Sequence, residues 1–147
     1  MNIKSEKKLN PRIEFLKVFK QLTYQHRAWD VWSDFIIMFA CALSNSVDKT
    51  HFDVREALYL RTIKRYNKHN QLLFSELVAH TVMALEENQE QDFLGNIYTE
   101  LGLNSMEHKQ IFTPYNVCEL MAEITMEDVA ERVNKDGYIT LNDEAVA

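Results

Sequence analysis

The sequence predicts a mainly α-helical protein with at most one or two short strands near its C-terminus. Only three Gly and two Pro occur among its 147 residues, which argues against a loop-rich β fold and against a disordered chain. Through most of the chain, apolar residues recur every three to four positions, which is the period of an amphipathic helix. The hydrophobic content of 46% is enough to build a compact multi-helix core.

Five helices are predicted before residue 104. Asn10 and Pro11 mark the start of the first helix, because Asn accepts hydrogen bonds from free helix amides and Pro suits the first turn. Asp92 has the same capping role in the fifth helix, which Gly102 is expected to end. The polar stretch Ser44-Asn45-Ser46 is expected to end the second helix. The predicted helices cover about 11–24, 30–43, 52–66, 71–87 and 93–101.

A polar loop, two short helices and one strand are predicted for the remaining residues. The loop runs from Asn104 to Ile111, and a helix then starts at Thr113-Pro114, with Thr113 as its cap. A second short helix is expected to end at Gly137. Tyr138 to Leu141 is rich in β-branched and aromatic residues, so we predict a strand there. A single strand cannot satisfy its own backbone groups, so it needs a neighbouring strand.

The charge of the chain is divided unevenly between its halves. Residues 1–70 hold 13 basic and 7 acidic residues, a net charge of +6, whereas residues 71–147 hold 3 and 15, a net charge of −12. Arg61, Lys64, Arg65 and Lys68 form a basic cluster near the end of the third predicted helix. This cluster predicts a nucleic-acid contact, although basic residues also stabilise a helix C-terminus without any ligand. Because the sequence pI is about 5.3, DNA binding by this chain alone is expected to be weak.

Several other kinds of protein are not supported by the sequence. Cys41 and Cys118 give neither a metal-ligand spacing nor a disulfide framework, and none of the five His has zinc-ligand spacing. We expect His80 to be a partly buried, hydrogen-bonded histidine rather than a base. No apolar run approaches the roughly 20 residues that cross a bilayer, and the N-terminus lacks a signal-peptide core. We therefore predict a cytoplasmic protein with no membrane span, no metal site and no catalytic residue of its own.

Two stretches of the sequence carry a resemblance to a known family. Residues 92–98 read Asp-Phe-Leu-Gly-Asn-Ile-Tyr and are followed by Glu-Leu-Gly-Leu at 100–103, and residues 110–114 read Gln-Ile-Phe-Thr-Pro. Together they resemble the N6-adenine DNA methyltransferases of type I restriction–modification systems, particularly the phage and prophage relatives. The segment from Trp29 to Asn45 is similar to the helical amino-terminal domain of that family. The resemblance covers nearly the whole chain but only the front part of a family member.

The resemblance implies a domain organisation and a cofactor site. Residues 1–104 would form the helical amino-terminal domain, and residues 105–147 would begin an S-adenosylmethionine-dependent methyltransferase domain packed with it as one unit. Gln110, Phe112, Thr113 and Asp143 would then lie at the edge of the cofactor pocket. A helix start offers free amides to a carboxylate, and an aromatic side chain can line an apolar cofactor wall. The alternative is an ordinary capped helix with Phe112 in the core; Lys109 also stands where the family usually has Gly.

The catalytic motif of the family is absent from the sequence. That motif, Asn-Pro-Pro-aromatic, holds the flipped adenine, but the only prolines here are Pro11 and Pro114. We therefore expect an amino-terminal fragment or truncated relative of such an enzyme, which neither methylates DNA nor binds S-adenosylmethionine alone. One alternative is a non-enzymatic binding module, such as a phage-type inhibitor of a host nuclease or restriction complex. Another is a helical interaction protein that forms a homodimer.

Overall fold

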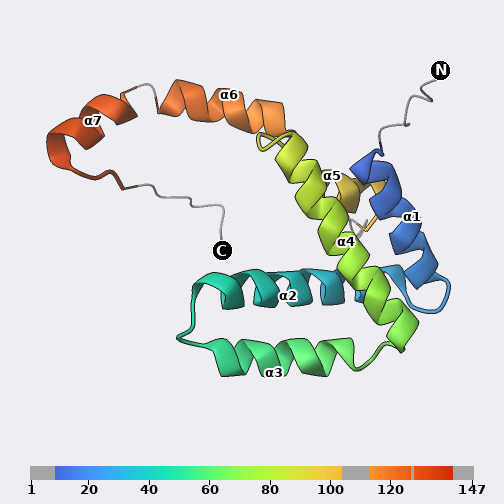
Figure 1. Cartoon of the computed structure of the whole chain (residues 1–147). Helices are drawn as coiled ribbons and strands as arrows, with labels where there is room; N and C mark the ends of the chain where they lie inside the picture. Colours follow the sequence, from blue (N-terminus) through green and yellow to red (C-terminus); the bar gives the residue numbers. More distant parts are fainter. Residues whose placement is uncertain (1–8, 104–112, 127, 141–147) are drawn as a thin grey trace, which may run out of the picture. The chain divides into compact units, whose positions relative to one another are not determined.

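The computed structural model describes residues 9–103, 113–126 and 128–140. These residues form seven helices and no strand (Figure 1). The predicted mainly α-helical class is therefore confirmed. The chain divides into two compact units, residues 1–110 and residues 111–147, and each is described here by itself.

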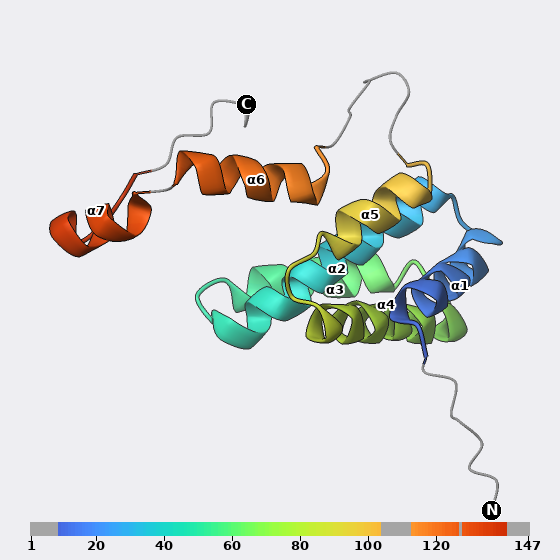
Figure 2. The ribbon, with the colours of Figure 1, turned by 90° about the horizontal axis from the view of Figure 1, so that it is seen from above.

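Unit 1 contains five helices in two antiparallel pairs. Helices α2 and α3 lie side by side as a hairpin, and α1 lies along α4 (Figures 1 and 2). The short helix α5 follows α4 and packs against it. The helix bounds are α1 (Pro11–Thr23), α2 (Ala28–Val47), α3 (Phe52–Ile63), α4 (Lys68–Glu87) and α5 (Phe93–Glu100).

The core of unit 1 is built around the ring of Phe15 on α1. This side chain is fully buried, and its ring centroid lies 5.5 Å from that of Phe35 on α2 and 5.7 Å from that of Phe93 on α5. Both contacts are edge-to-face, which is a favourable geometry for aromatic pairs. Helix α4 closes the core with Leu77 and Phe74. Four of the five helices thus share one apolar interior, which supplies the main driving force for folding.

Local signals in the sequence correctly predicted the starts of α1 and α5 and the end of α5. The Asn10 side chain accepts hydrogen bonds from the backbone amides of Arg12 at 3.0 Å and Ile13 at 3.2 Å. The Asp92 side chain accepts one from the amide of Gly95 at 2.8 Å. Gly102 follows α5 with a φ of 63°, the left-handed conformation that favours glycine after a helix end.

Helix α2 does not end where it was predicted to end. Ser44, Asn45 and Ser46 are helical, and the helix continues to Val47. Asn45 is buried, and its side-chain oxygen accepts a hydrogen bond of 2.8 Å from Arg55 of α3. A polar side chain that finds a partner on a neighbouring helix no longer competes with its own backbone, so the helix is not interrupted.

The turn between α3 and α4 also differs from the prediction. Helix α3 ends at Ile63 rather than near Tyr66, because Tyr66 turns inward and is buried. Helix α4 then begins at Lys68 rather than at Gln71, since the Asn67 side chain accepts a hydrogen bond from the amide of Asn70 at 2.9 Å.

Unit 2 contains α6 (Tyr115–Thr125) and α7 (Val129–Asp136). Pro114 takes the N-cap position of α6 and no side chain makes a capping hydrogen bond, so the prediction that Thr113 is the cap was wrong. Gly137 ends α7 with a φ of 80°, as predicted. Of the predicted strand, Tyr138–Thr140 is described and forms no strand, because no second extended segment pairs with it in the described residues. Leu141 and the predicted loop 104–111 lie outside the described residues.

Candidate functional site

The turn between α3 and α4 carries the four basic residues predicted to contact nucleic acid. Arg61 lies in the last turn of α3, Lys64 follows as its C-cap, Arg65 lies in the turn, and Lys68 is the first residue of α4. All four residues are exposed. The dipole of α3 stabilises Arg61 and Lys64, but Lys68 lies at a helix N-terminus, where the dipole disfavours a cation. Helix stabilisation therefore does not account for the whole cluster.

A buried carboxylate holds this turn in place. Asp34 of α2 is only 4% exposed, and its side chain accepts a hydrogen bond of 2.7 Å from the Tyr66 hydroxyl. Its second oxygen forms an ion pair with the guanidinium of Arg65. Buried charges are costly unless they are paired, so Arg65 and Tyr66 stabilise Asp34 and are positioned by it.

Burial, and then the hydrogen bond to Asp34, raise the pKa of Tyr66 well above its ordinary value. The Tyr66 hydroxyl therefore keeps its proton and remains a hydrogen-bond donor at neutral pH. Arg61, Lys64 and Lys68 make no ion pair with residues that the structure describes, whereas Arg65 is paired with Asp34 through one terminal nitrogen.

A second polar contact joins the α1–α2 loop to the same end of unit 1. The buried side chain of Asn70 donates a hydrogen bond of 3.2 Å to Gln25, and its Nδ2 atom lies 3.1 Å from His26 Nε2. The His26 ring packs against the Tyr66 ring, with centroids 4.7 Å apart. The exposed Arg27 follows His26 directly.

We define the basic corner as Arg27, Arg61, Lys64, Arg65 and Lys68. Arg27 could not be assigned to the cluster from the sequence, because it lies more than 30 residues from the other members and no local pattern links the two segments. The packing of Tyr66 on His26 and the contacts of Asn70 with the α1–α2 loop bring them to one end of the unit.

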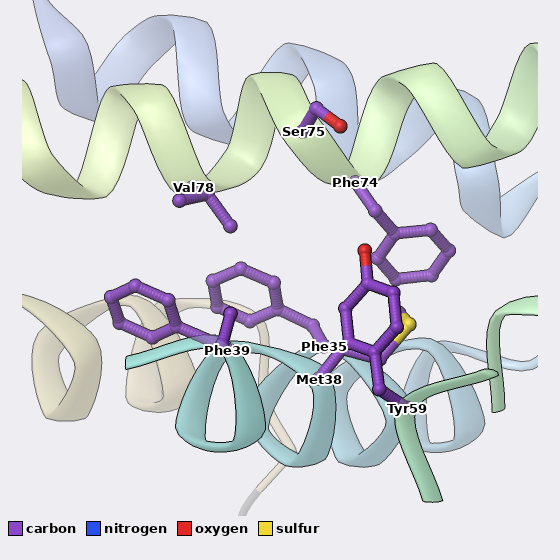
Figure 3. A pocket seen from close by; sticks show the side chains of 8 residues that line it. Phe35, Met38, Phe39, Tyr59, Phe74, Ser75 and Val78 are labelled. Carbon is purple, nitrogen blue, oxygen red and sulfur yellow. The ribbon is translucent and has the colours of Figure 1, made fainter. Parts of the chain in front are cut away.

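The residues of unit 1 that the structure describes line two hollows that bear on the site. The first, of about 350 Å³, adjoins the basic corner and is lined by Ile37, Leu58, Arg61, Thr62 and Arg65. The second, of about 210 Å³, is mostly apolar and lies between α2, α3 and α4 (Figure 3). It is lined by Phe35, Met38, Phe39, Ala42, Tyr59, Phe74, Ser75 and Val78. In Figure 3 the Tyr59 hydroxyl points toward α4. Sequence patterns cannot reveal such hollows, because they depend on how two or three helices pack together.

One polar atom in α4 lacks a partner. The Nδ1 atom of His80 is buried and makes no hydrogen bond with the residues that the structure describes. The prediction of a hydrogen-bonded histidine was therefore wrong at this atom, since the neighbouring side chains on α4 are apolar.

Of the four residues predicted to line the cofactor pocket, the structure describes only one. Thr113 is exposed, whereas Gln110, Phe112 and Asp143 lie outside the described residues. Helix α6, which follows Thr113, buries none of its residues. Its apolar side chains lie on one face and are exposed, Met121 by 57% and Ile124 by 68%, together with Val117 and Leu120.

No group of three or more metal-ligating side chains occurs among residues 9–103, 113–126 and 128–140. Within the same ranges, no helix is both long enough and apolar enough to cross a membrane. Cys41 and Cys118 are both free thiols, the first buried and the second exposed. Comparison with models of protein families, with curated proteins and with solved structures found no match for this chain.

Proposed function

We propose that this chain is the helical amino-terminal part of a protein related to the N6-adenine DNA methyltransferases, and that its basic corner contacts the phosphates of nucleic acid. The observation that carries the contact is the position of Lys68. It stands at a helix N-terminus with no acidic residue in the first turn and no ion pair in the described residues. A cation at this position is stabilised when a phosphate approaches.

The rigidity of the corner supports this proposal. Asp34 and Asn70 are buried polar side chains that hold the α3–α4 turn against α2 and the α1–α2 loop. Exposed cations on a fixed frame lose less conformational entropy when they meet a phosphate backbone. The buried polar groups are thus used to present charge rather than to fill the core.

The contact can be tested by fluorescence anisotropy with a labelled 20-base-pair duplex at several salt concentrations. We expect weak binding that falls steeply with salt, and the double variant Lys64→Gln/Lys68→Gln should reduce the slope of log K against log salt by roughly 1 to 2. A matched control is Lys17→Gln/Lys135→Gln, which removes the same charge on α1 and α7. Equal losses in both variants would show that net charge alone, and not the basic corner, determines binding.

The proposed relation to methyltransferases gives a role to the segment around α6. In the family, the residues matching Gln110, Phe112, Thr113 and Asp143 lie at the edge of the S-adenosylmethionine pocket. A helix that covers a parallel sheet has one apolar face, as α6 has in Val117, Leu120, Met121 and Ile124. We propose that this face packs on the remainder of the methyltransferase sheet, which the described residues do not contain. Calorimetry should detect no S-adenosylmethionine binding to this chain alone; binding at low micromolar strength would contradict the proposal.

The exposed face of α6 also favours a second function, that of a protein-binding module. An apolar stripe on an isolated helix is a common recognition element, and a nuclease or restriction subunit is the partner that the acidic second half would suit. Affinity purification from a host carrying such a system should then recover that subunit, and Leu120→Ser/Ile124→Ser should abolish its recovery. A homodimer formed through the same face would instead appear in light scattering as twice the mass of the chain.

A further inference from the structure

The hollow beside the basic corner has both an aliphatic surface and positively charged groups. Ile37 of α2 and Leu58 of α3 provide aliphatic surface, whereas Arg61 and Arg65 provide two guanidinium groups. We propose that this hollow binds a nucleotide, with the base on the aliphatic floor and the phosphate on the arginines. The nucleotide could be free or part of a nucleic-acid strand. In the second case the inference rests on the proposed nucleic-acid contact and deepens it.

The size of the hollow fits one nucleotide. Its volume is about 350 Å³, which is within the range of roughly 300–1,000 Å³ that small-molecule sites occupy. Ile37 and Leu58 are half-buried, so part of each side chain remains available to a planar base. A base in contact with them would be removed from water on one face, which is favourable for an aromatic ring.

The two arginines are arranged for one anion. Both line the same hollow, Arg61 from the last turn of α3 and Arg65 from the turn that follows it. Arg65 is oriented by its ion pair with buried Asp34, which engages one of its terminal nitrogens. A guanidinium has five N–H donors, so Arg65 retains donors for a second acceptor. Arg61 makes no ion pair in the described part of the chain, and no carboxylate lines the hollow.

The mixed lining distinguishes this ligand from simpler ones. An inorganic phosphate would use the arginines but leave the aliphatic floor exposed to water. An uncharged apolar molecule would fit the second hollow better, since that one is lined mainly by aromatic and aliphatic side chains. Guanidinium groups both bind phosphate bidentately and stack on planar rings, so the pair suits a ligand that has both parts.

The nucleotide could be free or part of a strand, because both carry a base and a phosphate. The stacked bases of a duplex cannot enter a hollow, so a strand could supply the ligand only from an unstacked position. Titrations with a mononucleotide, a single-stranded oligonucleotide and a duplex separate these sources.

The test is isothermal titration calorimetry and ¹⁵N NMR of the full chain with AMP, adenosine, inorganic phosphate, an eight-residue oligo-dA and a 20-base-pair duplex. We expect AMP to bind at least about tenfold more tightly than adenosine or phosphate, with shifts at Ile37, Leu58 and Thr62. Arg61→Gln should weaken AMP binding by about tenfold, a loss of one charge-assisted contact. The matched control is Lys135→Gln, an exposed cation of α7 that belongs neither to the hollow nor to the basic corner, and it should leave AMP binding unchanged.

Each outcome of this test is informative. Tighter binding of oligo-dA than of AMP, with the same dependence on Arg61, would assign the site to a strand; the reverse order would assign it to a free nucleotide. No AMP or oligo-dA binding at millimolar concentration, or equal losses in Arg61→Gln and Lys135→Gln, would overturn the inference. Duplex binding that persists while AMP binding fails would overturn this inference alone. AMP binding without any duplex binding would overturn only the proposed duplex contact.

Discussion

Removing the hydroxyl group of Tyr66 tests whether the buried polar cluster at the α3–α4 turn stabilises unit 1. Tyr66 is 5% exposed and donates a 2.7 Å hydrogen bond to Asp34. Tyr66→Phe retains the ring, which packs on His26 and Phe74 with centroid distances of 4.7 and 4.6 Å. The variant therefore removes one hydrogen bond to a charged group, worth about 1.5–3 kcal/mol. Because Asp34 keeps its ion pair with Arg65, we expect a loss of about 1.5–2 kcal/mol, at the lower end of this range.

The assay is urea denaturation followed by circular dichroism. With an m-value of about 2 kcal/mol/M, the expected loss lowers the urea midpoint by about 0.75–1 M and leaves m unchanged. Tyr59→Phe is the matched control, because the Tyr59 hydroxyl makes no hydrogen bond with residues that the structure describes. It should change the free energy of unfolding by less than about 0.5 kcal/mol. A Tyr66→Phe variant as stable as Tyr59→Phe would refute the reasoning.

The same substitution has a signature at alkaline pH. Burial and the contact with Asp34 raise the pKa of Tyr66 in the folded state, whereas an unfolded tyrosine titrates near pH 10. Above about pH 10 the unfolded state loses a proton that the folded state retains, so stability falls as pH rises. Tyr66→Phe should therefore lose stability less steeply than the wild type between about pH 10 and 11. Parallel curves for the two proteins would indicate that Tyr66 titrates normally.

Three further predictions concern other parts of unit 1. A Cβ at position 95 would lie 1.9 Å from Asp92 Oδ2, so Gly95→Ala should displace the cap and cost about 0.5–2 kcal/mol, partly offset by about 1 kcal/mol of helix propensity. In an Asp92→Ala background, where there is no cap to lose, Gly95→Ala should stabilise the protein. Urea denaturation of the wild type, the two single variants and the double variant checks this. Stabilisation by Gly95→Ala in both backgrounds would contradict the prediction. The Thr50 amide, and then Arg55, lower the pKa of Asp48 to about 2, so its contribution to stability is present above about pH 4 and is lost as pH falls toward 2. The urea midpoint should therefore fall less between pH 5 and pH 2.5 in Asp48→Asn than in the wild type. An equal fall in the two proteins would exclude this role for Asp48. Val78→Leu adds a methylene at the second hollow and should raise the free energy of unfolding by up to about 1 kcal/mol, seen as a higher melting temperature. A lower melting temperature would show that the hollow cannot accept the added group.

Local patterns in the sequence were enough for the helical class and for several helix ends. In α1 the 3.6-residue period of apolar side chains matches the observed burial, because Phe15, Phe19 and Leu22 are all buried. Caps at Asn10 and Asp92 could be read from the sequence because a cap bonds to amides only two or three residues away. Interactions of this range depend little on the rest of the fold.

The places where prediction failed are those where a distant partner decides the outcome. Asn45 remains helical because Arg55 of the next helix bonds to it, and Tyr66 ends α3 early because Asp34, 32 residues away, accepts its hydrogen bond. A strand at Tyr138 requires a second strand to pair with it, and the described residues contain no such strand.

The candidate site divides in the same way. The sequence by itself determined the cluster of Arg61, Lys64, Arg65 and Lys68, since these residues are close along the chain. Only the tertiary structure decided that Arg65 is paired with Asp34, that Arg27 joins the corner, and that two of the arginines line a hollow. The reason is physical: charge is carried by each residue type, whereas pairing, burial and enclosed volume arise only when helices far apart in sequence pack together.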